Sequence, residues 1–151
     1  LSFLVINLAR YVIDNKINTI IGIGDSPSMI LGIFFINVGV GHFVDPEWFE
    51  PIVPAMLGDP TFWVLLTGGM EIMLGIGIII PQTRKYSGLS MTFFLIAVYW
   101  ANLNMWVNDV PLEGKTFATF WHIIRLLAQI IMILIALWVG GWLSKKQPAT
   151  E

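Results

Sequence analysis

Long stretches of apolar residues, separated by short polar segments, dominate the chain. They cover about residues 27–44, 60–80, 87–107 and 117–143. A helix needs about 20 mostly apolar residues to cross the hydrocarbon core of a bilayer, because each residue rises about 1.5 Å. None of these stretches alternates apolar and polar residues as the strands of membrane barrels do. The pattern therefore predicts an all-α, polytopic membrane protein with a four-transmembrane-helix bundle.

The ends of these stretches carry residues that start and stop helices. Helices often begin with a capping side chain followed by a proline, whose missing N–H is not needed in the first turn. Three pairs fit this pattern: Ser26-Pro27, Asp45-Pro46 and Asp59-Pro60. The second pair predicts a short helix in the loop after the first span. Pro81 is expected to end the second span, because it cannot donate the next helical hydrogen bond.

The residues outside the four spans form two smaller regions. Residues 1–25 are amphipathic, with Asn7, Arg10, Asp14 and Asn18 on one helical face and Leu1, Leu4, Val5, Leu8 and Val12 on another. We expect this segment to lie on the cytoplasmic membrane surface, and docking to a partner is the alternative. It lacks a small-residue cleavage site, so we expect no cleavable signal peptide. Residues 26–144 form the bundle, and residues 145–151 a cytoplasmic tail.

The distribution of basic residues predicts the orientation in the membrane. Arg84 and Lys85 follow the second span, and Lys145 and Lys146 follow the fourth. Lys115 is the only basic residue in the loops on the opposite side, which are otherwise acidic. Because Lys and Arg concentrate on the cytoplasmic side, we expect both termini in the cytoplasm. Tryptophans 48, 63, 106 and 121 would then form an outer aromatic belt, with Tyr86 and Trp142 at the inner surface.

Composition narrows the classes of function. Hydrophobic residues make up 56% of the chain and charged residues 12%, about half the charged fraction of soluble domains. The net charge of −2, without a basic stripe, argues against nucleic acid as a partner. The absence of cysteine excludes disulfides, thiolate nucleophiles and iron–sulfur clusters.

Polar residues within the spans are the candidate functional residues, because a charge at the bilayer centre costs roughly 3 kcal/mol or more. They are His42, Glu71, Asn102, Asn104, His122, Arg125 and Gln129. His122, Arg125 and Gln129 stand at i, i+3 and i+7, so they share one helical face. Counting residues along each span places the whole set in the outer half of the bundle. We therefore expect a polar cluster there, contributed by all four helices.

Three interpretations of this cluster remain open. In the first, Glu71 and Arg125 neutralise one another within a structural network that holds the helices together. In the second, a pocket open to the outer leaflet brings a quinone carbonyl, a lipid head group or a proton to these side chains. In the third, His42 and His122 hold a haem, for which one pair of histidines is a weak signal. No further ligands at suitable spacing indicate zinc or another metal.

Small residues on the first two spans suggest close helix contact. They are Gly32, Gly39 and Gly41 on the first span and Gly68, Gly69, Gly75 and Gly77 on the second. Glycine lets two helix backbones approach each other within a membrane. We therefore expect these two spans to pack together.

Several short motifs resemble the DoxX family of small four-helix membrane proteins. They are Gly41-His42-Phe43, the run Gly-Gly-Met-Glu-Ile-Met-Leu-Gly at residues 68–75, Ala101-Asn102-Leu103, and the segment from His122 to Gln129. The resemblance spans roughly residues 31–138. It implies a bundle in a bacterial inner membrane and association with redox assemblies, thiosulfate:quinone oxidoreductase among them.

Three functions follow as expectations. The first is an accessory or structural subunit of a larger redox or respiratory-type membrane complex, without catalytic activity of its own. The second is a quinone-interacting subunit, in which Arg125 and His122 contact a quinone oxygen and Glu71 relays protons. The third is a small transporter or lipid-handling protein. Alternating access is difficult to build from a single copy of four spans without an inverted repeat. We therefore rank the transporter or lipid-handling function third.

Overall fold

The computed structural model describes residues 26–143. Its long helices are α2 (Ser26–Val44), α4 (Pro60–Ile79), α5 (Arg84–Val107) and α6 (Thr119–Val139). All four are long and apolar enough to cross a membrane. Between α2 and α4 the chain forms the short helix α3 (Pro46–Phe49) and the 3-10 turns η1 (Glu50–Ile52) and η2 (Ala55–Leu57). The predicted number of spans and the helical class are therefore confirmed within the described residues.

The helix limits differ most from the predicted ones at the start of α5 and at the two ends of α6, which begins at Thr119 rather than at residue 117. α5 begins at Arg84 rather than at residue 87, and the Arg84 side chain donates hydrogen bonds to the carbonyls of Ile78 and Ile79 at the end of α4. α6 ends at Val139, before Gly140 and Gly141, the second of which has a φ of 77°. A left-handed glycine is a common way for a helix to stop. The predicted interfacial segment, residues 1–25, and the tail lie outside the described residues.

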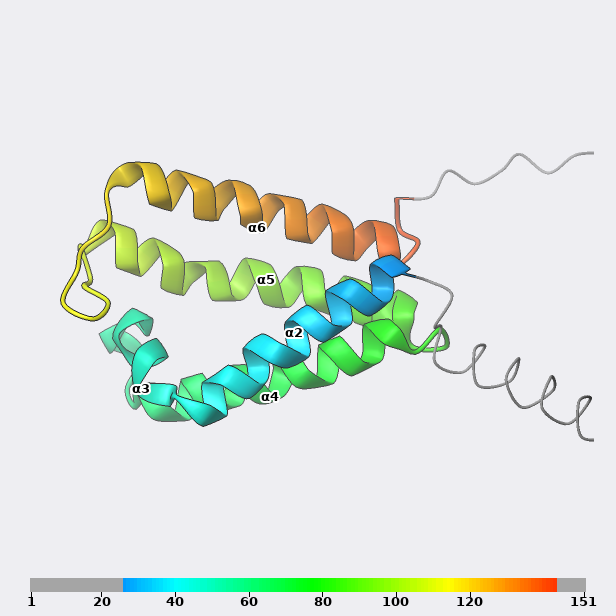
Figure 1. The fold of residues 1–151 in the computed structure, drawn as a ribbon, viewed down its shortest axis with the longest axis horizontal. Coiled ribbons are helices and arrows are strands. Elements are labelled where there is room, and N and C mark those ends of the chain that lie inside the picture. Colours follow the sequence, from blue (N-terminus) through cyan, green and yellow to red (C-terminus); the bar gives the residue numbers. More distant parts are fainter. Residues whose placement is uncertain (1–25, 144–151) are drawn as a thin grey trace, which may run out of the picture.

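The bundle consists of two helix pairs. α2 packs along α4 and α5 along α6, and fewer contacts join the two pairs (Figure 1). At one end of the bundle the pairs separate, and α3 lies there between them (Figure 1). We call this end the α3 end. α2 begins and α6 ends at the opposite end, as expected for an even number of antiparallel spans.

Glycines set the close contact between α2 and α4. A Cβ atom on Gly39 would lie 2.6 Å from the carbonyl oxygen of Gly68, and one on Gly75 would lie 2.7 Å from that of Gly32. These distances are shorter than any Cβ contact tolerates, so only glycine fits at these crossings. Gly69 does not take part, because a Cβ there would meet no atom within 4 Å.

The packed core lies toward the end opposite α3. Its buried residues are Leu31, Phe35, Ile78, Met91, Phe94, Leu95 and Ala136. Gly88 of α5 adds to it by bringing the α6 backbone close at Ala136 and Gly140. One half of the bundle is thus tightly packed, and the helices diverge in the other half.

The outer surface of the helices is apolar. Ile30, Met73, Phe93 and Leu134 are each at least half exposed, and each lies on a different long helix. An exposed apolar surface of this extent would be unstable in water, whereas lipid acyl chains cover it without penalty. The protein is therefore a helical membrane bundle.

Candidate functional site

Two cavities adjoin in the half of the bundle where the helix pairs diverge. Their volumes are about 260 Å³ and about 430 Å³. They share part of their lining: Phe49, Ile52, Glu71, Val98 and Asn102. Glu71 and Asn102 therefore lie where the two spaces meet.

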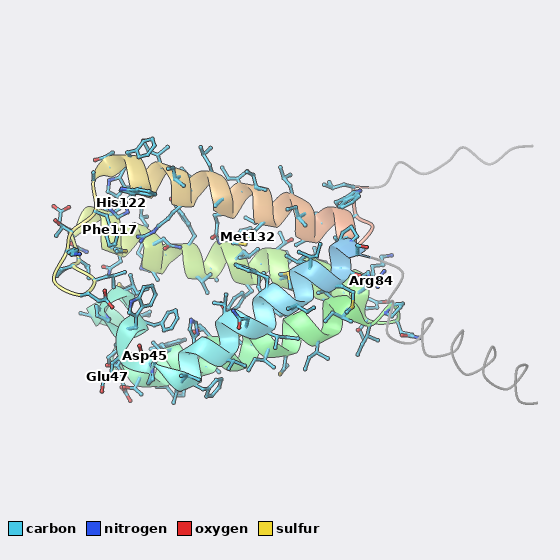
Figure 2. The ribbon with its side chains drawn as sticks, viewed as in Figure 1. Asp45, Glu47, Arg84, Phe117, His122 and Met132 are labelled. Atoms are coloured by element: carbon cyan, nitrogen blue, oxygen red, sulfur yellow. The ribbon has the colours of Figure 1, made fainter. Side chains whose placement is uncertain are left out.

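The smaller cavity lies between the helix pairs and is bounded by side chains of all four long helices. Most of its lining is aromatic or aliphatic, and its polar residues are Glu71, Asn102, Arg125 and Gln129. Phe117 lies at the α3 end and Met132, which lines the cavity, lies about midway along α6 (Figure 2). The cavity therefore extends from the diverging end toward the middle of the bundle.

The larger cavity opens between α4 and α5. Leu66 and Met70 of α4 and Ala97 of α5 line it, and all three are also exposed on the outside of the bundle. His42 and Thr67 are among its few polar residues. In a bilayer this opening faces the acyl chains, so an apolar molecule could enter sideways from the membrane.

Glu71 is partly buried beside His42. Its Oε2 atom lies 3.8 Å from Nδ1 of His42, too far for a hydrogen bond, and has no hydrogen-bond partner within residues 26–143. The Thr67 hydroxyl lies 3.5 Å from the same His42 nitrogen, and the His42 ring packs edge-on against Phe49 with 4.0 Å between centroids. A buried carboxyl oxygen without a donor is costly, because nothing replaces its lost hydration.

Arg125 lines the smaller cavity and has no acidic partner among the residues that the structure describes. Its Nη1 donates to the Met105 sulfur at 2.7 Å, and its guanidinium lies 4.7 Å from the Phe117 ring centroid. Thioether sulfur is a weak acceptor. The predicted Glu71–Arg125 ion pair is wrong, because within residues 26–143 the ionic contact of Glu71 is with His42. Glu71 lies on α4 and Arg125 on α6. These helices belong to different helix pairs, and the pairs diverge in this half of the bundle (Figure 1).

The other predicted site residues divide into two groups. Gln129 lines the smaller cavity, and its Nε2 donates to the Leu95 carbonyl at 2.6 Å, linking α6 to α5. Asn104 and His122 are not part of either cavity lining. Asn104 Nδ2 donates to the Ile52 carbonyl at 3.2 Å, and His122 stacks on Trp106 with 5.5 Å between centroids. These last two side chains hold the fold together around the site.

The α3 end is closed by residues that the sequence did not indicate. Trp48, Phe49 and Ile52, from α3 and η1, line the smaller cavity, as does Leu112 from the loop between α5 and α6. Leu112 and Lys115 exchange backbone hydrogen bonds across a tight turn, with Glu113 and Gly114 at positive φ. Asp45-Pro46 predicted the short helix and Trp48 was expected in the outer aromatic belt, but neither indicated that this helix lines a cavity.

The described residues contain no cluster of three or more His, Cys, Asp or Glu side chains that could hold a metal ion. His42 lines the larger cavity, whereas His122 is enclosed against Trp106. The two imidazoles thus face different surroundings rather than a common space that a haem could occupy. Glu71, Asn102, Arg125 and Gln129 instead line the smaller cavity.

The fold and cavities define the class: a four-helix membrane bundle with two adjoining, largely apolar cavities at one end. A family model described as Domain of unknown function (DUF8561) matches residues 31–140. The chain belongs to this family. No curated protein and no solved structure matches the chain.

The family match corrects the resemblance to DoxX, which is wrong. The motifs that suggested it combine small residues with isolated polar groups inside apolar helices. Many helical membrane bundles need both, because small residues allow close packing and inward polar groups satisfy each other. Short matches of this kind therefore do not distinguish one family from another.

Proposed function

We propose that this protein binds a small amphipathic molecule in the two adjoining cavities at the α3 end. The proposal rests on the position of Glu71 and Asn102, which line both cavities and lie where the two cavities meet. On one side is a cavity with acidic, basic and amide groups, and on the other is a cavity that opens toward lipid. Binding sites for small molecules commonly combine a mostly apolar wall with a few converging polar groups.

The polar and apolar parts of such a ligand would each occupy one of the two cavities. The polar part would occupy the smaller cavity, among Glu71, Asn102 and Arg125. The apolar part would extend through the larger cavity and leave between α4 and α5, past Leu66 and Ala97. This proposal develops the lipid-handling prediction. It needs no alternating access, because the ligand enters and leaves sideways through the membrane.

We place the protein in a bacterial inner membrane with both termini in the cytoplasm. The α3 end, where the loops are acidic, then lies on the outer side, and Arg84 and Lys85 lie at the cytoplasmic surface. The cavities would accordingly draw their ligand from the outer leaflet.

Retention of ligand by purified protein tests the proposal. The full chain would be purified from native membranes in a mild detergent and its bound small molecules measured by native mass spectrometry. Val98 lines both cavities, so Val98→Phe should fill the space and abolish retention. Ile96→Phe, at a site on the same helix that is 57% exposed, is the matched control and should retain ligand. Equal retention by both correctly folded variants would contradict the proposal.

A quinone is a second candidate for the same cavity. Arg125 and Gln129 both carry N–H donors on its wall, and quinone carbonyls accept hydrogen bonds. His122 has no part in this version, because it lies outside the cavity lining. A quinone recovered from wild type but absent from Arg125→Met would support it.

The role of an accessory subunit in a redox complex remains a prediction, but fewer observations now support it. Its link to redox complexes came from the DoxX resemblance, which is wrong, and the Glu71–Arg125 pair that supported it does not form within the described residues. The small size and the absence of cysteine remain in its favour. Purification of the native protein under mild conditions tests it directly. A protein that always migrates without other subunits would argue against it.

A further inference from the structure

We infer that the cavity recognises a zwitterionic lipid head group, with its ammonium at Glu71 and its phosphate at Arg125. This inference rests on the proposed binding function and specifies the ligand. It follows from the placement of one acidic and one basic side chain on the walls of a single cavity, within the described residues, without an ion pair between them.

The Glu71 side of the cavity has the chemistry that binds an ammonium group. The Oε2 atom lacks a hydrogen-bond donor within residues 26–143, and a choline-type ammonium, which has no N–H, would give the carboxylate a counter-charge instead. Phe49 lines both cavities with Glu71, and Trp48 and Phe35 line the smaller one. Aromatic faces beside an acidic group are the usual surroundings of bound ammonium and choline groups.

The Arg125 side has the chemistry that binds a phosphate. Among the described residues, its guanidinium donates to a sulfur atom and lies over an aromatic ring, so a stronger acceptor would replace a weak one. A planar guanidinium pairs with phosphate through two parallel hydrogen bonds. The amides of Asn102 and Gln129 line the same cavity and provide further polar groups.

A ligand with a single charge would leave one of these groups without a partner. An anion would satisfy Arg125 and bring a second negative charge near Glu71, and a cation would do the reverse. A zwitterion satisfies both ends and adds no net charge to the membrane interior. The opening toward lipid between α4 and α5 favours a head group with attached acyl chains over a water-soluble zwitterion.

Equilibrium binding with matched probes tests the inference. The full chain in maltoside detergent would be titrated calorimetrically with dodecylphosphocholine, dodecyl phosphate, dodecyltrimethylammonium and free phosphocholine. We expect dodecylphosphocholine to bind at least about tenfold more tightly than either singly charged probe, because it makes one more charged contact. Free phosphocholine, which lacks the chain, should bind most weakly.

Two variants assign the ends of the head group. Glu71→Gln should weaken binding of dodecylphosphocholine and dodecyltrimethylammonium, and it should leave binding of dodecyl phosphate unchanged or strengthen it, because a like charge is removed. Arg125→Met should weaken binding of dodecylphosphocholine and dodecyl phosphate, and it should leave binding of dodecyltrimethylammonium unchanged or strengthen it for the same reason. Arg125→Lys keeps the charge and should recover part of the affinity for phosphate, and it serves if Arg125→Met does not fold.

Two kinds of failure can be told apart. Equal affinity for the three chain-bearing probes, or tightest binding by free phosphocholine, would overturn the inference. If Val98→Phe still abolished that binding, the cavity would remain an amphiphile site and the proposed function would stand. No binding by any probe, or binding unaffected by Val98→Phe, would overturn both.

Discussion

Glu71 and Arg125 line the same cavity and, within the described residues, form no ion pair with each other. In a membrane protein this is an expensive arrangement, since both groups lose hydration without gaining a strong partner. Proteins commonly accept such a loss at functional sites, where stability is given up for binding. The relationship between these two residues is therefore the main reason to regard the cavity as a binding site.

The close contact of α2 and α4 predicts that Gly75 does not tolerate a larger residue. Gly75→Ala should lower the free energy of unfolding by about 1–3 kcal/mol, because the added methyl group meets backbone atoms of Gly32. Gly69→Ala is the matched control on the same helix, where a Cβ meets nothing within 4 Å. It should leave stability unchanged or raise it by up to about 1 kcal/mol. Unfolding in mixed detergent micelles measures both, and equal effects would refute the proposed packing.

The position of His122 predicts a separation of stability from binding. His122→Phe preserves the aromatic stack on Trp106, so we expect stability and ligand retention close to wild type. His122→Ala removes the stack and should lower stability while the folded fraction retains ligand. Loss of ligand from well-folded His122→Phe would show that the imidazole takes part in binding, as the sequence had suggested.

The turn between α5 and α6 predicts a stabilising substitution. Glu113 and Gly114 both have positive φ, as in a type I′ turn, where Asn-Gly is the preferred pair. Glu113→Asn should therefore raise the free energy of unfolding by up to about 1 kcal/mol. Glu113→Gln removes the same charge without favouring the left-handed conformation, so it should give no such gain. A gain of the same size from both would assign the effect to charge instead.

The proposed orientation can be tested by cysteine labelling, because the natural sequence contains no cysteine. Thr116 lies in the exposed loop at the α3 end, and Gln82 is exposed at the opposite end. A membrane-impermeant maleimide should label Thr116→Cys in intact cells and label Gln82→Cys only after the membrane is permeabilised. The reverse pattern would place the cavity on the cytoplasmic side.

Much of the fold could be predicted from the sequence because its signals are local. The length of each apolar run gave the spans, and Asp59 confirms its predicted capping role by accepting a hydrogen bond from the Thr61 N–H at 3.1 Å. Asp45 also precedes a proline, but its side chain makes no capping bond, and α3 forms without it. The glycines predicted the contact between α2 and α4, although Gly41, Gly69 and Gly77 do not lie in it.

The details of the site could not be predicted, because they depend on how the helices are rotated and spaced. Residue counting placed Glu71 and Arg125 in the outer half of the bundle, but depth alone does not say whether two side chains on different helices meet. The divergence of the two helix pairs keeps them apart and creates the cavity. Likewise, His122 shares a helical face with Arg125, yet it packs against Trp106 because that ring fills the space beside it.

The unfolding free energy of Glu71→Gln, compared with wild type in the absence of added ligand, tests the central claim most directly. If the carboxyl is held unpaired for a ligand, the neutral amide removes a desolvation penalty, and stability should stay the same or rise. If Glu71 and Arg125 instead form a structural pair, removing one partner should cost about 3–5 kcal/mol. A loss of that size, restored by adding Arg125→Met, would contradict the account.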